Sequence, residues 1–424
     1  MRNTTRISLI LLCLQLILMG TASAQKRADQ DLLQKLLLKQ NDSLMQAILQ
    51  DPQKYHLQVI YTQIDRNRHN KPYFTSYTLG LDSARYFYPA STVKLATAAV
   101  ALEKLNKLKK TGITKYTSFS IDSAYARQTS VASDSSSASG LPSVGHYIKK
   151  IFLVSDNDAY NRLYEFIGQQ QLNNALHQKG YKEVRLLHRL SVGDGGERSR
   201  YTNPVTFFDD KGIVLYQQPL VYNPAVYPNK LKTTSIGNGY YSNGELIKQP
   251  MDFSEKNYMS LSSLQSILKS IVLPEGVAPQ QRFDLTEEDY AFLYKYMSML
   301  PRESQHPAYN VKEYPDSYAK FLIFGGQQER LPEHIRVFNK VGDAYGYLID
   351  NAYVVDFDNK VEFLLSAVIL ANDKMIFNSD DYQYETVALP FMAKLGQAVY
   401  EHELKRRRKY KPKLNKFMVD YTKE

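Results

Sequence analysis

Two residues that could act as a nucleophile and its base lie in the stretch Tyr86–Leu108. Ser91 and Lys94 are three positions apart, after the apolar letters YFYP and before apolar residues that recur with a helical period. This pattern predicts a strand end followed by a helix, on which the Lys94 amine and the Ser91 hydroxyl share a face. Serine is a weak nucleophile until a base removes its proton, and a lysine desolvated by burial can be that base. The alternative is a helix capped by serine, with a solvated lysine.

Two later stretches contain residues that could complete such a site. Ser155 and Asn157 belong to the letters SDN, and offer a hydroxyl that could pass on a proton and an amide that could hold a carbonyl. Lys340 ends a predicted strand and is followed by Val341 and Gly342, where the glycine permits close approach to the strand edge. The alternatives are a helix N-cap for the first stretch and a strand ending in a turn for the second.

In this order the stretches resemble the S-x-x-K, S-D-N and K-T-G elements of the active-site serine penicillin-recognising enzymes. The resemblance is greatest to the class A β-lactamases, because YPASTVKLATAAVAL and VSDNDAYNRL are similar to that class beyond the motifs themselves. It covers approximately residues 30–205 and 258–403. It implies a secreted serine hydrolase that forms an acyl-enzyme on a β-lactam or a related amide.

The resemblance also implies a role for each of seven positions. The catalytic positions are Ser91 as nucleophile, Lys94 as its base, Ser155 as proton shuttle and Lys340 as electrostatic anchor. The substrate-binding positions are Asn157, Gly342 and Asp343, and the oxyanion hole would use the backbone N–H groups of Ser91 and Asp343.

Two departures from the class A pattern bear on turnover. Class A enzymes deacylate with a glutamate in the loop pattern E-x-x-L-N, which is absent from the matching residues 187–204. Glu197 and Asp194 are the acidic candidates there, and both could equally be exposed charges of a glycine-rich loop. Val341 stands where the family has a hydroxyl that helps to bind the β-lactam carboxylate. Losing such a hydrogen bond costs about 1.5–3 kcal/mol of binding free energy.

Other chemistry finds little support in the sequence. The eight histidines show no H-E-x-x-H spacing, and Cys13 is the single cysteine, so we expect no metal site. Neither a P-loop nor a G-x-G-x-x-G after a strand occurs, which argues against a nucleotide, and we expect no cofactor.

The first 24 residues predict export. Arg2 and Arg6 precede an apolar run from Ile7 to Met19, and the letters ASA end at Ala24, where we expect a signal peptidase to cut. Cys13 lies inside the apolar run, so we expect no lipid anchor, and the run is too short for a membrane span. The mature protein is therefore expected to be periplasmic or secreted.

Positive charge is concentrated at the C-terminus. Residues 404–424 contain nine Lys or Arg against two acids, within a formal net charge of +10 for the whole chain. We interpret this tail as an extended arm that contacts an anionic cell envelope, or as a solvated end that binds nothing. Export argues against a nucleic-acid partner.

The pattern of elements predicts an α/β (α+β) fold, and the resemblance implies that it is of the β-lactamase/transpeptidase type. Strands at both ends of the chain form an antiparallel sheet flanked by helices, with a mostly helical lobe (about 108–330) inserted between the second and third strands. Predicted strands are 56–65, 73–79, 336–340, 345–357 and 361–370; predicted helices are 29–50, 95–108, 144–153, 158–166, 169–179, 260–271, 286–299, 317–324 and 389–405. A Tyr-rich insertion at about 206–257 has no counterpart in the resemblance, and the domain is expected to span 25–403.

Three functions remain open from the sequence. The first is a class A-type β-lactamase acting on a small-molecule β-lactam. The second is a D,D-peptidase or penicillin-binding protein acting on peptidoglycan peptides, which the missing E-x-x-L-N favours. The third is a non-catalytic envelope-binding module, for which Val341 and the insertion are the main support.

Overall fold

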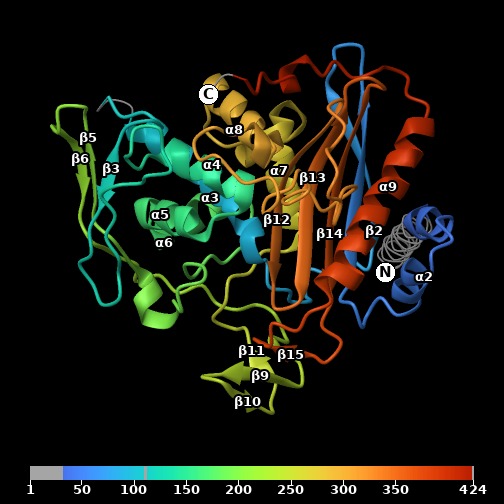
Figure 1. Cartoon of the computed structure of the whole chain (residues 1–424), viewed down its shortest axis with the longest axis horizontal. Coiled ribbons are helices and arrows are strands. Elements are labelled where there is room, and N and C mark those ends of the chain that lie inside the picture. The colour runs from blue at the N-terminus through green and yellow to red at the C-terminus, as the bar shows by residue number, and fades with distance from the viewer. Residues whose placement is uncertain (1–31, 109–111, 423–424) are drawn as a thin grey trace, which may run out of the picture.

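A computed structural model describes residues 32–108 and 112–422. The predicted signal peptide lies outside the described residues. At the centre is a five-stranded antiparallel sheet in the order β12-β13-β14-β1-β2 (Figure 1). Its strands are β1 (Gln58–Arg66), β2 (Pro72–Leu79), β12 (Ile335–Ala344), β13 (Tyr347–Asp356) and β14 (Val361–Leu370).

The two ends of the chain meet inside this sheet. Strand β1 pairs antiparallel with β14, with Tyr61 opposite Leu365, although some 300 residues separate them in sequence. The predicted architecture is confirmed: the helical region is inserted between β2 and β12, which are the second and third strands of this sheet in chain order. Strands β13 and β14 are buried along their whole length because both faces of the sheet are covered.

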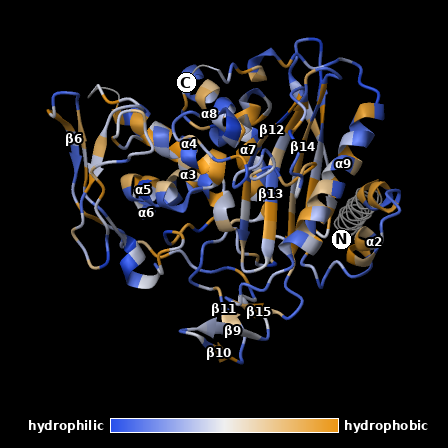
Figure 2. Ribbon diagram, in the orientation of Figure 1, coloured by the Kyte–Doolittle hydropathy of each residue, from blue (hydrophilic) through white to orange (hydrophobic). Residues whose placement is uncertain are grey.

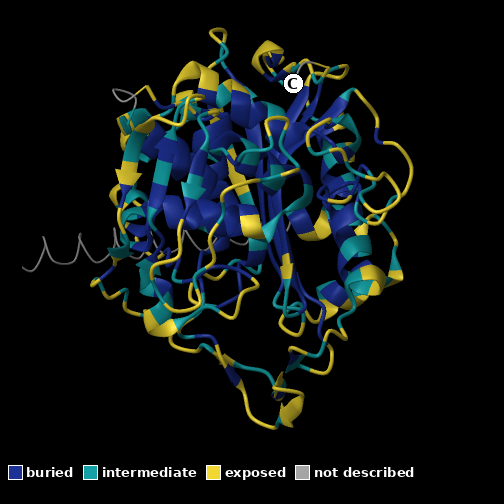
Figure 3. Cartoon of the chain, turned by 60° about the vertical axis from the view of Figure 1, so that its left-hand side comes forward, coloured by how far each residue is buried: buried dark blue, intermediate teal, exposed yellow. Residues whose placement is uncertain are grey.

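Helices cover the two faces of the sheet unequally. One face packs against α9 (Leu389–Lys405), α2 (Ser43–Gln50) and a helix over residues 32–38. The other packs against α7 (Leu261–Val272) and α8 (Glu287–Ser298), beyond which lie α3 (Val93–Leu108), α4 (Val144–Val154), α5 (Asn157–Ile167) and α6 (Gln169–Gln178). Figure 2 shows hydrophobic residues along the sheet and α3, and Figure 3 shows buried residues along the strands of the sheet and the helices of the lobe.

Helix α3 is the central element of the helical lobe. Its residues are buried from Val93 to Leu105, so it has no solvent-facing side over that length. A helix that is apolar on nearly all sides needs neighbours all round, and α5, α4, α6 and α7 supply them. The residue at its start is therefore held by the core of the lobe.

Three of the predicted elements are wrong. The single helix at 29–50 is broken, because Asn41 has a left-handed backbone (φ 49°) and Asp42 caps α2 by accepting from the Met45 N–H. Residues 86–89 form no strand. Residues 317–324 form turns instead of a helix, because the N–H groups of Phe321 and Leu322 donate to the buried Asp350 carboxylate.

The Tyr-rich insertion divides into two small β structures. Strands β5 (Val205–Phe208) and β6 (Val214–Gln218) extend β3 (Phe119–Ile121) on the far side of the helical lobe. Strand β9 (Gly239–Ser242) pairs with β10 (Glu245–Ile247) on one side and with β15 (Ile376–Phe377) on the other, in the excursion at the bottom of Figure 1. Two-residue strands link them: β4 (Tyr201–Thr202) with β7 (Val221–Tyr222), and β8 (Ser235–Ile236) with β11 (Met251–Asp252).

The basic tail differs from the extended arm that the sequence predicts. Arg406 and Arg408 both bond the buried Glu403 carboxylate, and Arg406 also pairs with Asp65 at 2.6 Å. Phe417 is fully buried against the rings of Tyr294, Phe338 and Tyr353, at 5.1, 5.2 and 4.9 Å between centroids. Much of the charge and apolar surface of the tail is thus used within the protein. Among the described residues, no helix has the length and apolar character that crossing a membrane requires.

We predict that Phe417→Ala lowers the free energy of unfolding by about 3–5 kcal/mol, because it empties a site in an aromatic core. Urea denaturation followed by circular dichroism measures this change. The neighbouring Met418 is 65% exposed, and Met418→Ala serves as the control, with an expected change below about 0.5 kcal/mol. Equal stability of the two variants would show that the tail does not dock.

Candidate active site

The turn that carries Ser91 is short and strained. Residues Ala90–Thr92 form a 3₁₀ turn that leads directly into α3, and the Pro89 carbonyl accepts from the N–H (3.1 Å) and the hydroxyl (2.5 Å) of Thr92. Ala90 has a φ of 46°, a left-handed conformation that costs a non-glycine residue about 1–2 kcal/mol. The surrounding core keeps this conformation, so Ser91 is held at the helix start by its neighbours.

Gly342 brings strand β12 against this turn. A side chain at this position would place its Cβ 2.9 Å from the backbone nitrogens of Ser91 and Thr92 and 3.0 Å from the Pro89 carbonyl oxygen. Such distances leave no room for a Cβ. The strand edge carrying Lys340 and Asp343 can therefore lie beside Ser91 only because residue 342 is glycine.

Lys94 is the fully buried cation of the site. Its Nζ donates to the Ser155 carbonyl, to Asn157 Oδ1 at 2.6 Å and, more weakly, to Ser155 Oγ at 3.4 Å. These acceptors belong to the junction of α4 and α5, where Ser155 ends α4 with a left-handed backbone (φ 59°). Among the described residues, the acceptors of Lys94 Nζ belong to Ser155 and Asn157 and not to Ser91. Hydrogen bonds between catalytic groups are often long before substrate binds.

Lys340 approaches the same serine from the sheet. Its Nζ donates to Ser155 Oγ and to the Val341 carbonyl, both at 2.8 Å. The Ser155 hydroxyl thus lies between two lysines, one on α3 and one on β12. This arrangement can carry a proton between groups on either side of the hydroxyl.

Both lysines are easier to deprotonate than an ordinary lysine. Burial, aided by the positive charge of Lys340, holds the pKa of Lys94 well below its usual value. Burial lowers the pKa of Lys340 to about 7, although the Asp343 and Asp350 carboxylates act in the opposite direction. The lowered pKa of Lys94 favours its neutral amine, which is the form that a general base requires.

Asn157 connects the lysine to the loop of residues 187–204. Its Oδ1 accepts from Lys94, so its Nδ2 is left to donate, and it does so to Ser191 Oγ at 2.9 Å. Ser191 has a left-handed backbone (φ 58°) and lies in the cleft together with Asn157. Sequence reasoning missed Ser191, because no motif in residues 187–204 marks a serine as a site residue.

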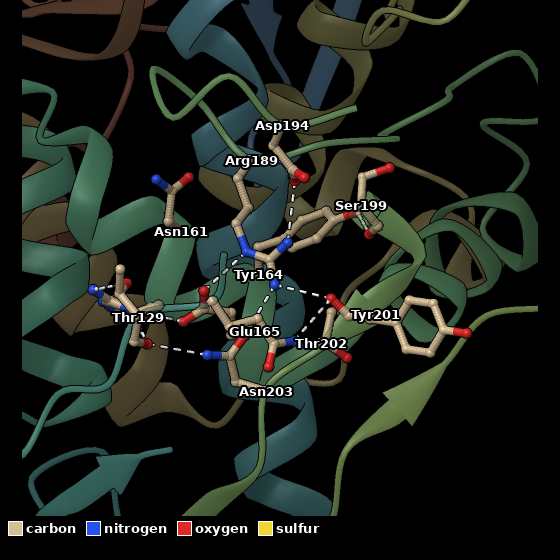
Figure 4. A network of polar contacts seen from close by, with 12 residues as sticks. Thr129, Asn161, Tyr164, Glu165, Arg189, Asp194, Ser199, Tyr201, Thr202 and Asn203 are labelled. Atoms are coloured by element: carbon tan, nitrogen blue, oxygen red, sulfur yellow. Dashed lines mark hydrogen bonds and ion pairs between the residues drawn. The ribbon is translucent and has the colours of Figure 1, made fainter. Parts of the chain in front are cut away.

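A buried ion network fixes that loop to α5 (Figure 4). Arg189 donates to Glu165 Oε1 at 2.9 Å and pairs with Asp194 at 3.1 Å, while Arg162 binds the other Glu165 oxygen at 3.1 Å. Arg189 also donates to Asn203 Oδ1 at 3.0 Å. Each charge in this network has an opposite partner, so the loop is held where Ser191 faces the cleft.

Neither acidic candidate of the loop lies in the cleft. Asp194 is turned toward Arg189, and accepts from both its backbone N–H and its guanidinium at 3.1 Å. The Glu197 side chain is 57% exposed and faces Arg200 at 4.0 Å. The structure therefore brings Ser91, Lys94, Ser155, Asn157 and Lys340 together, and leaves Glu197 and Asp194 apart from them.

The cleft in front of Ser91 has a volume of about 410 Å³. Most of its other lining residues are aromatic or polar and come from distant segments: Tyr88, Leu190, Ser191, Asp343, Tyr345, Asn378, Asp380, Tyr382 and Tyr384. The segment 378–384 follows β15, so the pairing of β15 with the insertion helps to place one wall. Sequence reasoning missed this wall because it carries no motif.

Comparison with known proteins gives a family for part of the chain. The model of the "Beta-lactamase enzyme family" matches residues 22–209, which include Ser91, Ser155 and Asn157 and end before Lys340. The resemblance that the sequence suggests is confirmed there. No curated protein matches the chain.

Solved structures of β-lactamases are distantly similar to this chain. A class A beta-lactamase from Clostridium kluyveri has 15% sequence identity and a TM-score of 0.45, over 84% of this chain and 97% of that one. A beta lactamase from Xanthomonas campestris pv. campestris has 14% identity and a TM-score of 0.46, over 88% and 98% of the two chains. A beta-lactamase from Streptosporangium roseum has 14% identity and a TM-score of 0.46, over 88% and 99%.

We predict that Arg189→Met lowers the free energy of unfolding by about 3–5 kcal/mol, because it strips Asp194 and one oxygen of Glu165 of their buried partner. Amide hydrogen exchange should become faster in residues 187–204 than elsewhere. Arg198→Met in the same loop is the matched control: this side chain binds only the Gly193 carbonyl, at 3.0 Å, so we expect less than about 1 kcal/mol. A stable Arg189→Met variant with unchanged exchange would contradict the anchoring role.

Proposed function

Residues 22–209 belong to the beta-lactamase enzyme family, and from that premise we propose that the protein is an acyl-transferring serine hydrolase with Ser91 as nucleophile. The single observation that carries the proposal is the buried Lys94 amine, bonded to Ser155 and Asn157 one helical turn from Ser91. A lysine buried beside a second lysine is costly to charge, and the lowered pKa that results suits a general base.

The proposed reaction is attack by Ser91 Oγ on an amide or lactam carbonyl. Lys94 takes the hydroxyl proton, and the backbone N–H groups of Ser91 and Asp343 stabilise the oxyanion. The C–N bond then breaks, and the leaving nitrogen receives a proton through Ser155, which hydrogen-bonds both lysines. The product is a Ser91 acyl-enzyme, which water must hydrolyse for turnover.

The loop favours slow release of that acyl group. Ser191 is the loop residue that lies in the cleft beside Asn157, whereas Asp194 and Glu197 do not line it, and a hydroxyl is a poor general base. This supports the second function, a penicillin-binding or D,D-peptidase-like enzyme that forms a long-lived acyl-enzyme, over a fast β-lactamase. A non-catalytic envelope-binding module remains the third function and is an outcome of the first test below.

Charge in the cleft bears on the substrate. Asp343 and Asp380 both line it, and Val341 offers no donor. Burial raises the pKa of Asp343, against the attraction of Lys340 and Lys94. A substrate carboxylate close to the scissile bond lacks a hydroxyl donor at Val341, so we expect β-lactams to bind less tightly than they would with that donor present.

We predict that the protein without its signal peptide forms a covalent adduct with a penicillin, seen by intact mass, and that Ser91→Ala forms none. Lys94→Met should slow adduct formation by about 10²–10⁴-fold, the usual contribution of a general base. In the wild type the rate should rise with pH as Lys94 loses its proton, with the midpoint well below 10.5. Circular dichroism controls for folding.

Normal labelling of a folded Lys94→Met variant would remove the base from the mechanism. No adduct and no hydrolysis of penicillins, cephalosporins or D-Ala-D-Ala thioesters by the wild type would favour the binding module.

We predict that Ser191→Glu shortens the lifetime of the acyl-enzyme by about tenfold or more, because it introduces a carboxylate beside Asn157 that can activate water. The measurement follows loss of the adduct by mass spectrometry after excess reagent is removed. Ser191→Gln has the same size without the base and should leave the lifetime unchanged. Equal lifetimes in both variants would show that the hydroxyl at this position does not limit deacylation.

A further inference from the structure

A second cavity lies away from the catalytic cleft, between the insertion and the helical lobe. We name it the insertion cavity; its volume is about 620 Å³, and it shares no lining residue with the cleft. One wall is residues 226–231 of the Tyr-rich insertion, and the opposite wall is built from 83–84, 182–185 and Tyr258, with His177. The segment without a counterpart in the family resemblance therefore creates this cavity.

Arg185 is the buried cation in its wall. The residue is 5% exposed, and its Nη1 donates to the Ser254 carbonyl at 3.2 Å. Its Nη2 is buried and has no hydrogen-bond partner among the described residues. A guanidinium is always charged, so a donor of this kind is costly to leave unsatisfied.

The backbone holds Arg185 rigidly in this position. Its N–H and carbonyl pair with those of Tyr258 at 2.9 and 2.8 Å, and the Tyr258 hydroxyl donates to the Ser83 carbonyl at 2.6 Å. Burial lowers the pKa of the guanidinium, against the pull of Glu255. The nearby Glu183 carboxylate is bonded instead to the hydroxyls of Ser260 and Ser263, at 2.6 and 2.9 Å.

The remaining wall is mainly apolar. Val226 is 77% exposed, and Tyr227, Pro228 and Leu231 follow it along the same wall. Lys182 and Lys230 add positive charge at exposed positions of the rim. A concave apolar surface that ends at an unsatisfied buried cation has the form of a binding site for an anion with an apolar body.

We propose that the insertion cavity binds a small amphiphile with a carboxylate head, which pairs with the Arg185 guanidinium while its apolar body covers Val226 and Leu231. The site is separate from the catalytic cleft, so binding there does not depend on Ser91. The insertion then has a purpose in this protein: it adds a ligand site to the hydrolase domain.

Isothermal titration with dodecanoate, below its micelle concentration, tests the proposal. We expect saturable one-to-one binding to the wild type and to Ser91→Ala. Dodecanol and dodecyltrimethylammonium have the same chain without the anionic head, and should bind at least tenfold more weakly. Equal binding of all three probes would mean that only apolar contact acts there, and no binding of dodecanoate would overturn the proposal.

Two pairs of variants place the binding. Arg185→Gln should weaken dodecanoate binding by at least tenfold, whereas Arg282→Gln, an exposed arginine that does not line the cavity, should change nothing. If Arg185→Gln fails to fold, Val226→Glu at the exposed rim repels the carboxylate, with Val226→Gln as the matched control. Unchanged affinity in both Arg185→Gln and Val226→Glu would place dodecanoate elsewhere and overturn the assignment.

Discussion

The burial of the Lys94 amine is the constraint on which the rest of the site depends. Lys94 lies on α3, which is packed in the core from Val93 to Leu105, and its hydrogen bonds go to the α4–α5 junction. A charged Lys94 needs these acceptors within hydrogen-bond distance of its amine. The positive charge of Lys340, which comes from the sheet, makes protonation of Lys94 less favourable still. The sheet and the helical lobe therefore meet around Lys94, a residue whose protonation is unfavourable.

A glycine and a set of ion pairs place the two segments that complete the site: strand β12 beside Ser91, and the loop of residues 187–204 beside Asn157. Gly342 lets an edge strand lie against the turn of Ser91, which no residue with a Cβ could do. Arg189 ties the loop of residues 187–204 to Glu165 on α5, so that Ser191 meets Asn157. Neither Gly342 nor Arg189 needs to touch a substrate, yet both decide which groups do.

Much of the fold follows from periodicity. Helix α9 begins and ends where the sequence predicts, and the five strands of the sheet are found within a few residues of their predicted bounds. The predictions failed where long-range contacts override local preference. Residues 317–324 give their N–H groups to the Asp350 carboxylate, which lies on a strand that follows them in the chain. The tail packs Phe417 into an aromatic core, although its charge pattern is typical of a solvated arm.

The sequence alone identified the residues of the proposed nucleophile, base and shuttle, because each pair is close along the chain. Ser91 and Lys94 are one helical turn apart, and Ser155 and Asn157 lie together at the start of a helix. Only the tertiary structure decided which loop residue faces them. Glu197 and Ser191 are both polar residues of one glycine-rich loop, and their sequence does not distinguish them. The difference arises from Arg189, whose buried charge must be compensated by Glu165 and Asp194, and this requirement turns Ser191 inward and leaves Glu197 in solvent.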